Sequence, residues 1–342
     1  MRCPSFKGHN RLMRVLTDSR WIRSDGIGRF ASEALARIQS DVVEINPPLP
    51  LFSPLEQVWI PARLFNESSD LFFTPGINPP VLSPIPFVFV IHDLIPLTFS
   101  EETGLLKKLY YNLILGVAVR RAKMVLTVSE FSKQEIIDHF GLDPEKIAVV
   151  GNGVDERFRP EGPTHDRGEP YLLYVGNTRP HKNVEAAIEG YARSGIQDQV
   201  RLLLSGSPTP SLMEVVRANG VEEAVDFADF IPEEELPAYY RGATALVHPS
   251  LHEGFGLPVL EALACGTAVV ASNATAIPEV TGDAAHLFDP TNISEIASAM
   301  RKVVLDDSFR TLLEKRGPER AKKFSWEGVA RRTESALRAA VA

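Results

Sequence analysis

Short runs of β-branched and aromatic residues alternate with longer amphipathic stretches along almost the whole chain, and this alternation constrains the fold most strongly. In the first part, the strand-like runs occupy residues 13–17, 42–45, 71–73, 87–91, 124–128 and 147–149. The run FVFVI at 87–91 is apolar on both faces, which is typical of a parallel sheet covered by helices on both sides. Helical patterns lie between the runs, at residues 29–38, 105–121 and 132–140.

The same alternation restarts after a break at residues 159–170 (RPEGPTHDRGEP), whose proline, glycine and charge content is typical of an interdomain linker. The second series predicts strands at 171–175, 200–204, 224–227, 243–247, 268–271 and 286–288, and helices at 183–193, 211–219, 233–241, 257–264, 293–304 and 308–319. A single core stops growing at about 250–300 residues. We therefore predict two doubly wound α/β domains, at 1–160 and 161–325. A final helix at 326–342 has no assigned packing position, and a return to the first domain is one option.

Composition narrows the class of protein. The net charge of −8 argues against a general nucleic-acid binder, which needs a basic face to neutralise phosphates. The two cysteines, Cys3 and Cys265, have neither metal-ligand spacing nor a disulfide pattern. No apolar run approaches the roughly 20 residues of a membrane span, and the polar start at residues 1–10 does not resemble a signal peptide. We expect a cytoplasmic protein, with Met13 as an alternative natural start.

The segment 251–261 (LHEGFGLPVLE) carries the most chemical information, because it follows a predicted strand and opens a predicted helix. Gly254 and Gly256 permit close approach of the backbone, and a helix N-terminus is suited to an anion such as a pyrophosphate. Glu253 and Glu261 flank this anion site, where hydroxyls of a sugar and of a ribose are natural partners for carboxylates. The alternative is a plain turn, with Glu261 favoured by the helix dipole.

The two glutamates and the Gly-Phe-Gly-Leu-Pro sequence between them closely resemble the signature of the family 4 retaining glycosyltransferases. Further matches are DGIG at 25–28, HDLIPL at 92–97, TVSEFSK at 127–133, NGVD at 152–155, YVGN at 174–177, PHKN at 180–183 and PEVTGDAA at 278–285. Several of these motifs look closest to bacterial mannosyltransferases of O-antigen and exopolysaccharide synthesis. The resemblance implies the GT-B fold, in which two Rossmann-like domains face each other across a cleft.

The resemblance also implies roles for residues of the second domain. It places Glu253 on the hydroxyls of the transferred sugar and Glu261 on the nucleotide ribose. The backbone from Gly254 through Phe255, Gly256 and Leu257 would hold the sugar and the phosphates. Lys182 matches the lysine that neutralises the departing diphosphate, and its position just after a strand agrees, because fixed positive charge there lowers the barrier. A solvated lysine at a helix start is the alternative.

At the other positions that the family uses to bind the donor, this sequence matches the family pattern only in part. Gly176 matches the family's strand-end glycine, but Asn177 stands where many members have arginine, and Arg179 is the candidate replacement. The base is expected near Ile231. In the first domain, Gly28 belongs to a GxG sequence that by itself more often marks a tight turn, but that the family places against the donor phosphates and the acceptor. His92 ends a buried strand, where a structural histidine is the commoner outcome, but the HD match places it beside the transferred sugar.

These features together predict a retaining hexosyltransferase that uses a nucleotide sugar, with GDP-mannose as the first candidate and UDP- or dTDP-sugars as alternatives. No metal or other cofactor is expected, since there is no Asp-x-Asp pair. The predicted acceptor is a glycan or a polyprenyl-diphosphate-linked oligosaccharide, and nucleic acid is not an expected partner. A sugar-nucleotide epimerase and a non-catalytic binding protein remain as rival functions.

Residues 105–123, from Leu105 to Lys123, combine an apolar face with five basic residues. An ordinary packed helix with solvated charges is one interpretation of this segment. The other is peripheral contact with the cytoplasmic face of the inner membrane, where each basic residue adds about 1 kcal/mol on an anionic surface.

Overall fold

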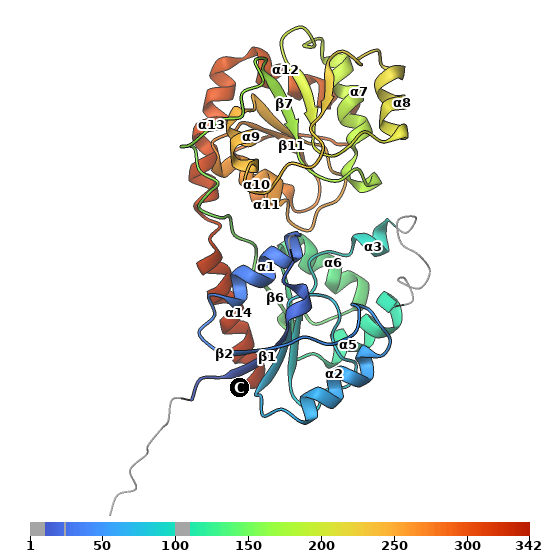
Figure 1. The fold of residues 1–342 in the computed structure, drawn as a ribbon, viewed down its shortest axis with the longest axis vertical. Helices are drawn as coiled ribbons and strands as arrows, with labels where there is room; N and C mark the ends of the chain where they lie inside the picture. Colours follow the sequence, from blue (N-terminus) through green and yellow to red (C-terminus); the bar gives the residue numbers. More distant parts are fainter. Residues whose placement is uncertain (1–10, 24, 100–109) are drawn as a thin grey trace, which may run out of the picture.

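The computed structural model describes residues 11–23, 25–99 and 110–342, and it contains two parallel six-stranded sheets. The first sheet has the order β2-β1-β3-β4-β5-β6 and the second the order β12-β11-β10-β7-β8-β9, with every neighbouring pair of strands parallel. Figure 1 shows the two sheets with their helices stacked one above the other, the first half below and the second above. The two-unit α/β architecture predicted from the sequence is confirmed.

All the strands expected from the sequence are present, with ends that differ by at most two residues. The first sheet consists of β1 (Arg14–Asp18), β2 (Asp41–Ile45), β3 (Leu71–Thr74), β4 (Phe87–Val90), β5 (Met124–Thr127) and β6 (Ile147–Val149). The second consists of β7 (Tyr171–Tyr174), β8 (Arg201–Leu204), β9 (Val225–Phe227), β10 (Ala245–His248), β11 (Val269–Ser272) and β12 (His286–Phe288). The central strands β3, β4, β7 and β10 are buried at every residue, as helices on both faces require.

The helices of the first half are α1 (Gly26–Leu35), α2 (Glu56–Phe65), α3 (Ile95–Thr98), α5 (Gly116–Arg121) and α6 (Glu130–Phe140), with a π-helical segment at Tyr110–Leu115 leading into α5. Those of the second are α7 (Val184–Ser194), α8 (Pro210–Ala218), α9 (Leu236–Gly242), α10 (Leu257–Ala264), α11 (Ile277–Thr281), α12 (Ile293–Leu305) and α13 (Asp307–Ala321). Short 3₁₀ turns lie at Ser19–Trp21, Pro144–Lys146 and Pro180–Lys182. Helices α2, α3 and α11 were not expected from the sequence.

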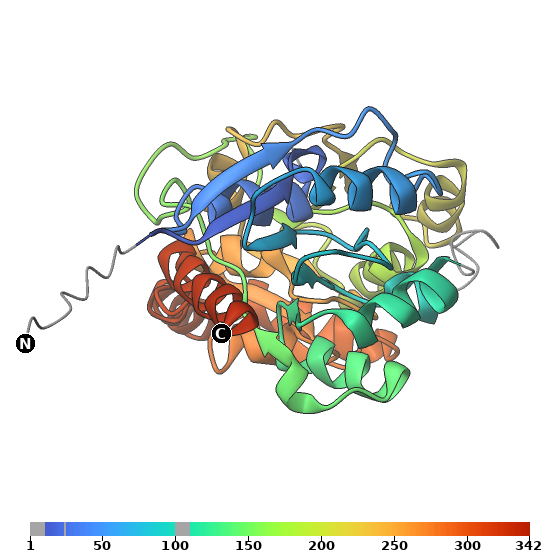
Figure 2. The same cartoon turned by 90° about the horizontal axis from the view of Figure 1, so that it is seen from below.

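The last helix, α14 (Trp326–Val341), leaves the second half and packs on the first. Trp326, Val329 and Leu337 are buried in the same apolar cluster as residues of β1, β3 and β4. The backbone amide of Trp326 also lies so close to Gly153 that a Cβ atom there would approach it to 2.5 Å. Figures 1 and 2 both show the carboxyl terminus beside the first sheet, so the chain joins the halves twice.

None of the described helices has both the length and the apolar character that a membrane crossing requires.

Candidate active site

The two halves touch where the carboxyl ends of their strands face each other. Ser129, which caps α6 in the first half, donates a 2.7 Å hydrogen bond from its hydroxyl to the carbonyl of Gly254 in the second. Gly254 also packs against the end of β4, so closely that a Cβ atom there would lie 2.2 Å from the carbonyl oxygen of His92. The GFG turn therefore forms part of the interface between the halves.

Lys182 and Glu253, 71 residues apart in the sequence, meet in one buried ion pair. The distance from Lys182 Nζ to Glu253 Oε1 is 2.7 Å, and the two side chains are only 14% and 9% exposed. His248, the last residue of β10, brings its Nε2 to 3.0 Å from the same oxygen. The 3₁₀ turn at Pro180–Lys182 and the loop after β10 thus place two expected catalytic residues side by side.

The charge state of Glu253 follows from these neighbours. Burial acts to raise the pKa of its carboxyl, but the Lys182 ammonium and the His248 ring hold that pKa well below its ordinary value. The backbone amide of Glu253 donates to Thr275 Oγ1 at 3.0 Å, which fixes the loop. Glu253 is therefore an ionised acceptor, suited to hydroxyl groups.

Glu261 lies in α10 and belongs to a second charged cluster that spans the cleft. Arg29 of α1 donates to Glu261 Oε1, and the Tyr240 hydroxyl donates to Oε2 at 2.9 Å. Arg29 also pairs with Glu233, which in turn accepts from Arg157. Glu261 is 4% exposed, and its burial raises the pKa of its carboxyl above the ordinary value even though Arg29 and Tyr240 oppose this.

The turn before α10 depends on glycine. Gly256 is the N-cap of α10 with φ of 102°, and a Cβ atom there would lie 2.6 Å from Ile277 Cδ1. Across the cleft, Gly26 also packs closely, because a Cβ atom there would lie 3.3 Å from Leu257 Cδ1. Phe255 is buried, and its ring packs edge-to-face on Phe324 at 5.9 Å between centroids.

The remaining expected donor residues lie around this centre. Asn177 and Arg179 are exposed, and the Gly176 amide donates to Ser205 Oγ at 2.9 Å. Ile231 is buried, but its neighbour Phe230 is 84% exposed. Gly28 is held in a tight turn by its amide, which donates to the Asp25 side chain at 2.8 Å.

His92 is buried within the first half. Its Nε2 lies 2.9 Å from the carbonyl oxygen of Pro75, and its ring packs edge-to-face on Phe30 at 5.1 Å. Burial lowers the pKa of His92 below its ordinary value, so the neutral ring is favoured. The neighbouring Asp93 accepts a hydrogen bond from the Ile95 amide at 3.1 Å.

Three residues that contribute to these contacts, His248, Arg29 and Glu279, were not singled out as site residues from the sequence. His248 ends a buried strand five residues before Glu253, and that position was a usable signal. Arg29 directly follows the GxG turn. Glu279 accepts hydrogen bonds from the backbone amides of Glu130 and Phe131 at the start of α6, at 2.9 and 2.6 Å. Such pairing between distant segments leaves no trace in a single sequence.

Two family models match the chain, "Glycosyltransferase Family 4" over residues 18–158 and "Glycosyl transferases group 1" over residues 155–320. O-antigen chain mannosyltransferase B from Escherichia coli is 32% identical over 265 residues, which cover 73% of this chain and 70% of that protein. The chain belongs to glycosyltransferase family 4. Serotype-specific mannosyltransferase WbdA, also from Escherichia coli, is 29% identical over 71% of this chain, which spans about a third (32%) of WbdA.

Family membership agrees with the architecture of this glycosyltransferase. The crystal structure of HepE from Anabaena, in complex with UDP and glucose, superposes with a TM-score of 0.76 at 17% identity, covering 95% of this chain and 99% of HepE. The two facing parallel sheets form the GT-B fold that the resemblance implied.

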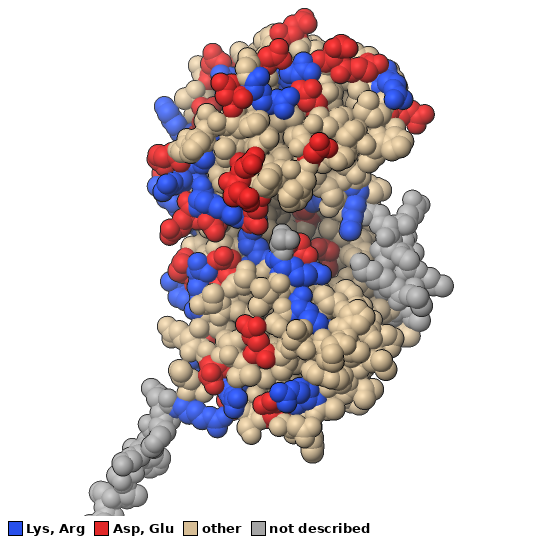
Figure 3. All heavy atoms as spheres, viewed as in Figure 1, with Lys and Arg blue, Asp and Glu red and all other residues tan. Residues whose placement is uncertain are grey.

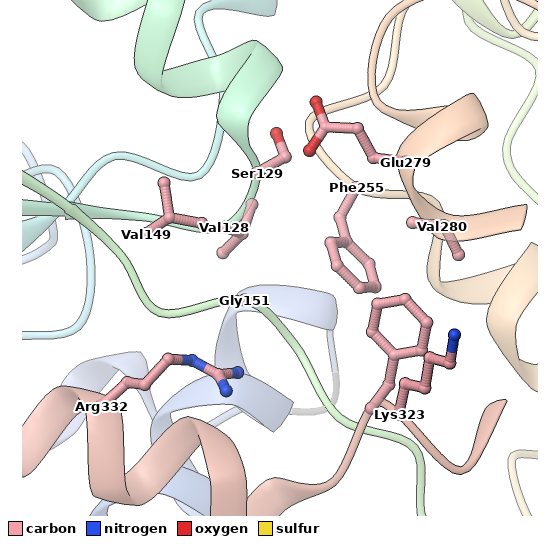
Figure 4. A pocket seen from close by; sticks show the side chains of 10 residues that line it. Val128, Ser129, Val149, Gly151, Phe255, Glu279, Val280, Lys323 and Arg332 are labelled. Carbon is pink, nitrogen blue, oxygen red and sulfur yellow. The ribbon is translucent and has the colours of Figure 1, made fainter. Parts of the chain in front are cut away.

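A cavity of about 230 Å³ opens beside the interface of the two glycosyltransferase halves. Val128 and Ser129 line it from the first half, Glu279 and Phe255 from the second, and Arg332 from α14; Figure 4 shows these side chains around it. Of the expected site residues, it includes Phe255 but not Lys182, Glu253 or Glu261. Within the part of the chain that the structure describes, no three His, Cys, Asp or Glu side chains are grouped to hold a metal ion.

Proposed function

We propose that this family 4 glycosyltransferase is a retaining mannosyltransferase that transfers mannose from GDP-mannose to a growing surface polysaccharide. The observation that carries the proposal is the buried Lys182–Glu253 pair beside the GFG turn. A cation and an ionised hydroxyl acceptor sit together there, next to a helix N-terminus suited to a diphosphate. The names of the mannosyltransferase relatives support mannose as the sugar.

In this proposal the donor occupies the second half. The diphosphate lies against Lys182 and the backbone of the GFG turn, the mannose hydroxyls on Glu253 and the ribose on Glu261. The base lies near Ile231, where the exposed Phe230 ring offers a stacking surface. Exposed Arg179 is positioned on the loop that also carries Lys182, and we assign it the second positive charge that the arginine missing at Asn177 would supply.

The reaction follows from this arrangement. The bond between the mannose C1 and the phosphate oxygen breaks, and Lys182 stabilises the negative charge that develops on the diphosphate. The acceptor hydroxyl attacks C1 from the same face, and its proton passes to the leaving phosphate oxygen. We assign to the close contact between Gly254 and the His92 carbonyl the exclusion of water from the reacting centre. His92 contributes from the first half as a neutral group close to the sugar.

The acceptor in this proposal is a glycan or a polyprenyl-diphosphate-linked oligosaccharide, and the first half supplies a surface for it. The N-cap of α2, Leu55, and two residues within the helix, Val58 and Phe65, are exposed apolar side chains on one helical face. The loop at Val81 bonds both to Gln57 of α2, at 2.7 Å, and to Arg121 of α5, at 3.0 Å. These contacts make α2, this loop and α5 one continuous surface.

We call the surface formed by α2, the loop at Val81 and α5 the lipid-facing surface. It extends the membrane contact predicted for residues 105–123, of which residues 105–109 lie outside the described residues. Its further exposed apolar members are Leu82, Leu113 and Val117, and Arg121 and Lys123 are exposed at its edge. Figure 3 shows the right-hand surface of the lower half, where α2 and α5 lie in Figure 1, with few charged side chains. An apolar face with a basic edge fits an anionic membrane.

Sedimentation with vesicles of phosphatidylglycerol tests the lipid-facing surface. We expect Val58→Glu and Phe65→Glu to weaken binding, while Leu312→Glu, at an exposed apolar residue of the second half, serves as the matched control. Binding that is unaffected by the α2 substitutions, or absent in the wild type, contradicts the membrane contact.

A donor screen tests the proposed function. Purified protein is heated in EDTA with GDP, UDP, dTDP and their sugar conjugates, and a ligand at 100 times its Kd stabilises it by about 2.7 kcal/mol. Stabilisation by GDP and GDP-mannose supports the proposal. The UDP complex of HepE makes a UDP-sugar the second candidate, which selective stabilisation by UDP would favour. Epimerisation of a donor without acceptor, or binding without turnover, would establish one of the rival functions instead.

A further inference from the structure

We propose that Arg29, which comes from the half opposite the donor, positions Glu261 for the nucleotide ribose, so that the ribose site is complete only when the two halves meet. This inference rests on the donor placement proposed above. It concerns a residue that makes no contact with the donor in that placement and acts through Glu261.

The local fold directs Arg29 into the cleft. The tight turn before α1 is closed by the Gly28 amide on Asp25, and a Cβ atom at Gly28 would come within 2.1 Å of the Arg23 carbonyl oxygen. Gly26 lets α1 approach Leu257 at the start of α10. Arg29 then reaches across from the first turn of α1, and its side chain is only 17% exposed.

The hydrogen bonds to Glu261 leave acceptor positions on its carboxylate that a ribose could use. Its carboxylate has about four acceptor positions, and protein donors take one on each oxygen: Arg29 on Oε1 and the Tyr240 hydroxyl on Oε2. One further position on each oxygen suits the two adjacent hydroxyls of a ribose. Two fixed donors, one from each half, hold the carboxylate plane in one orientation.

Arg29 is also the cation that compensates the buried charge. Glu261 is 4% exposed, and within its own half the hydrogen bond to its carboxylate comes from the neutral Tyr240. Arg157 also acts on Glu261, but it pairs with Glu233, and the buried Cys265 lies near Glu261 at the C-cap of α10. An isolated carboxylate in this setting favours its protonated form, because burial penalises the charge.

Arg29 itself is held in place from several sides. Its second guanidinium nitrogen pairs with Glu233, and its Cζ lies 5.9 Å from the centroid of the Phe158 ring. Arg157 lies over the same ring at 5.2 Å. A side chain fixed by two carboxylates and an aromatic face is preorganised, so little entropy is lost when the ribose arrives.

The test measures binding of GDP and UDP, and of their 2′,3′-dideoxy forms, to the full-length protein by calorimetry. The variants are Arg29→Met, Arg29→Lys and Glu261→Gln, with Arg37→Met as matched control, because Arg37 lies two residues beyond the end of α1 and pairs at the surface with Glu33 and Glu327. For whichever ribonucleotide binds the wild type, we expect Arg29→Met to lower affinity about tenfold or more, Arg29→Lys to restore part of it, and Arg37→Met to leave it unchanged.

Two readouts separate a positioning role from general damage. The dideoxy nucleotide should bind Arg29→Met and wild type equally, because the lost contact is to the ribose hydroxyls. Affinity of Arg29→Met for the ribonucleotide should recover as the pH rises from 6 to 8.5, because the pKa of Glu261 rises further once its cation is gone and the ionised form returns only at higher pH.

The outcomes distinguish the inference from the proposed function. If Glu261→Gln leaves ribonucleotide affinity unchanged, the donor placement is wrong. If Glu261→Gln weakens binding but Arg29→Met does not, the donor placement stands and the role of Arg29 is refuted. Equal losses for the ribose and dideoxy forms in Arg29→Met, or tighter binding by that variant, also overturn the positioning role.

Discussion

Replacing Gly254 by alanine should separate the two halves of the enzyme by a small and calculable amount. The added Cβ atom would lie 2.2 Å from the carbonyl oxygen of His92 and 3.0 Å from Asp93 Cβ. The nearest of these atoms is backbone, which cannot rotate away, so the halves must move apart by about 1 Å to restore van der Waals contact. The 2.7 Å hydrogen bond from Ser129 to the Gly254 carbonyl stretches with the same movement.

A displacement of this size matters because, in the proposed function, the first half presents the acceptor and the second half holds the donor. Misplacement of reacting groups by about 1 Å can cost roughly 100-fold in rate. We therefore expect Gly254→Ala to lower kcat/KM for transfer by about that factor. Nucleotide binding should fall by less than that factor, because Glu253 and Lys182 both belong to the second half and keep their 2.7 Å pairing, although the contact between Arg29 and Glu261, which spans the halves, is loosened.

Steady-state transfer kinetics and calorimetric nucleotide binding measure the two effects separately. Gly116→Ala is the matched control, since a Cβ atom there meets nothing closer than the end of the Arg120 side chain at 3.8 Å. Small-angle scattering with nucleotide bound should show a larger radius of gyration for Gly254→Ala. Transfer at the wild-type rate by Gly254→Ala would refute the idea that this contact defines the reactive closed form.

Other consequences of the structure are open to test. Lys182→Met and Glu253→Gln should each lower the free energy of unfolding by about 3 kcal/mol and abolish transfer. The double variant should lose less stability than the sum of the two, because neither charge is then left buried alone. Urea titrations in which the two losses simply add would contradict a stabilising ion pair between Lys182 and Glu253. Because the pKa of Glu253 is lowered on folding, its contribution is present above its ordinary value of 4.5 and is lost in acid, so the deficit of Glu253→Gln should shrink below about pH 4. Glu279→Gln removes the charge that meets the positive end of α6 and should weaken closure by about 1 kcal/mol, seen as an expanded form in scattering, whereas an unchanged scattering profile would argue against it. Leu337→Ala should lower the free energy of unfolding by about 2–5 kcal/mol, because Leu337 is fully buried between α14 and the first sheet. As a control, Arg338→Ala, at an exposed neighbour, should lower it by under 1 kcal/mol. Equal losses in the two variants would show that α14 is loosely docked.

The strands and the order of elements could be predicted from the sequence because their signal is local. Runs such as that around β4 are apolar on both faces, and such a pattern has few structural solutions. Helix α2 was missed because Pro54 and Pro61 flank and interrupt it. Pro61 lies within the helix as its sixth residue, and burial of Ile60 and Leu64 against the core outweighs the lost backbone hydrogen bond.

The candidate site could be predicted from the sequence only in part, because only the features that lie within one short segment leave a signal there. Glu253, Glu261 and the glycines between them lie in one short segment, and Lys182 could be placed by its position after a strand. The partners across the cleft could not be predicted. Arg29 and Glu261 are 232 residues apart, and Ser129 and Gly254 are 125 apart, so only the packing of the halves brings them together.

The central claim is retaining, metal-independent transfer from GDP-mannose, and proton NMR of the donor with the protein in EDTA tests it most directly. Without an acceptor, the enzyme slowly transfers the sugar to water, and the anomeric signal of the first-formed mannose reports the stereochemistry. We expect release of GDP together with α-mannose, and loss of both in Lys182→Met. Formation of β-mannose, a requirement for added divalent metal, or no release from GDP-mannose while another nucleotide sugar is consumed would contradict it.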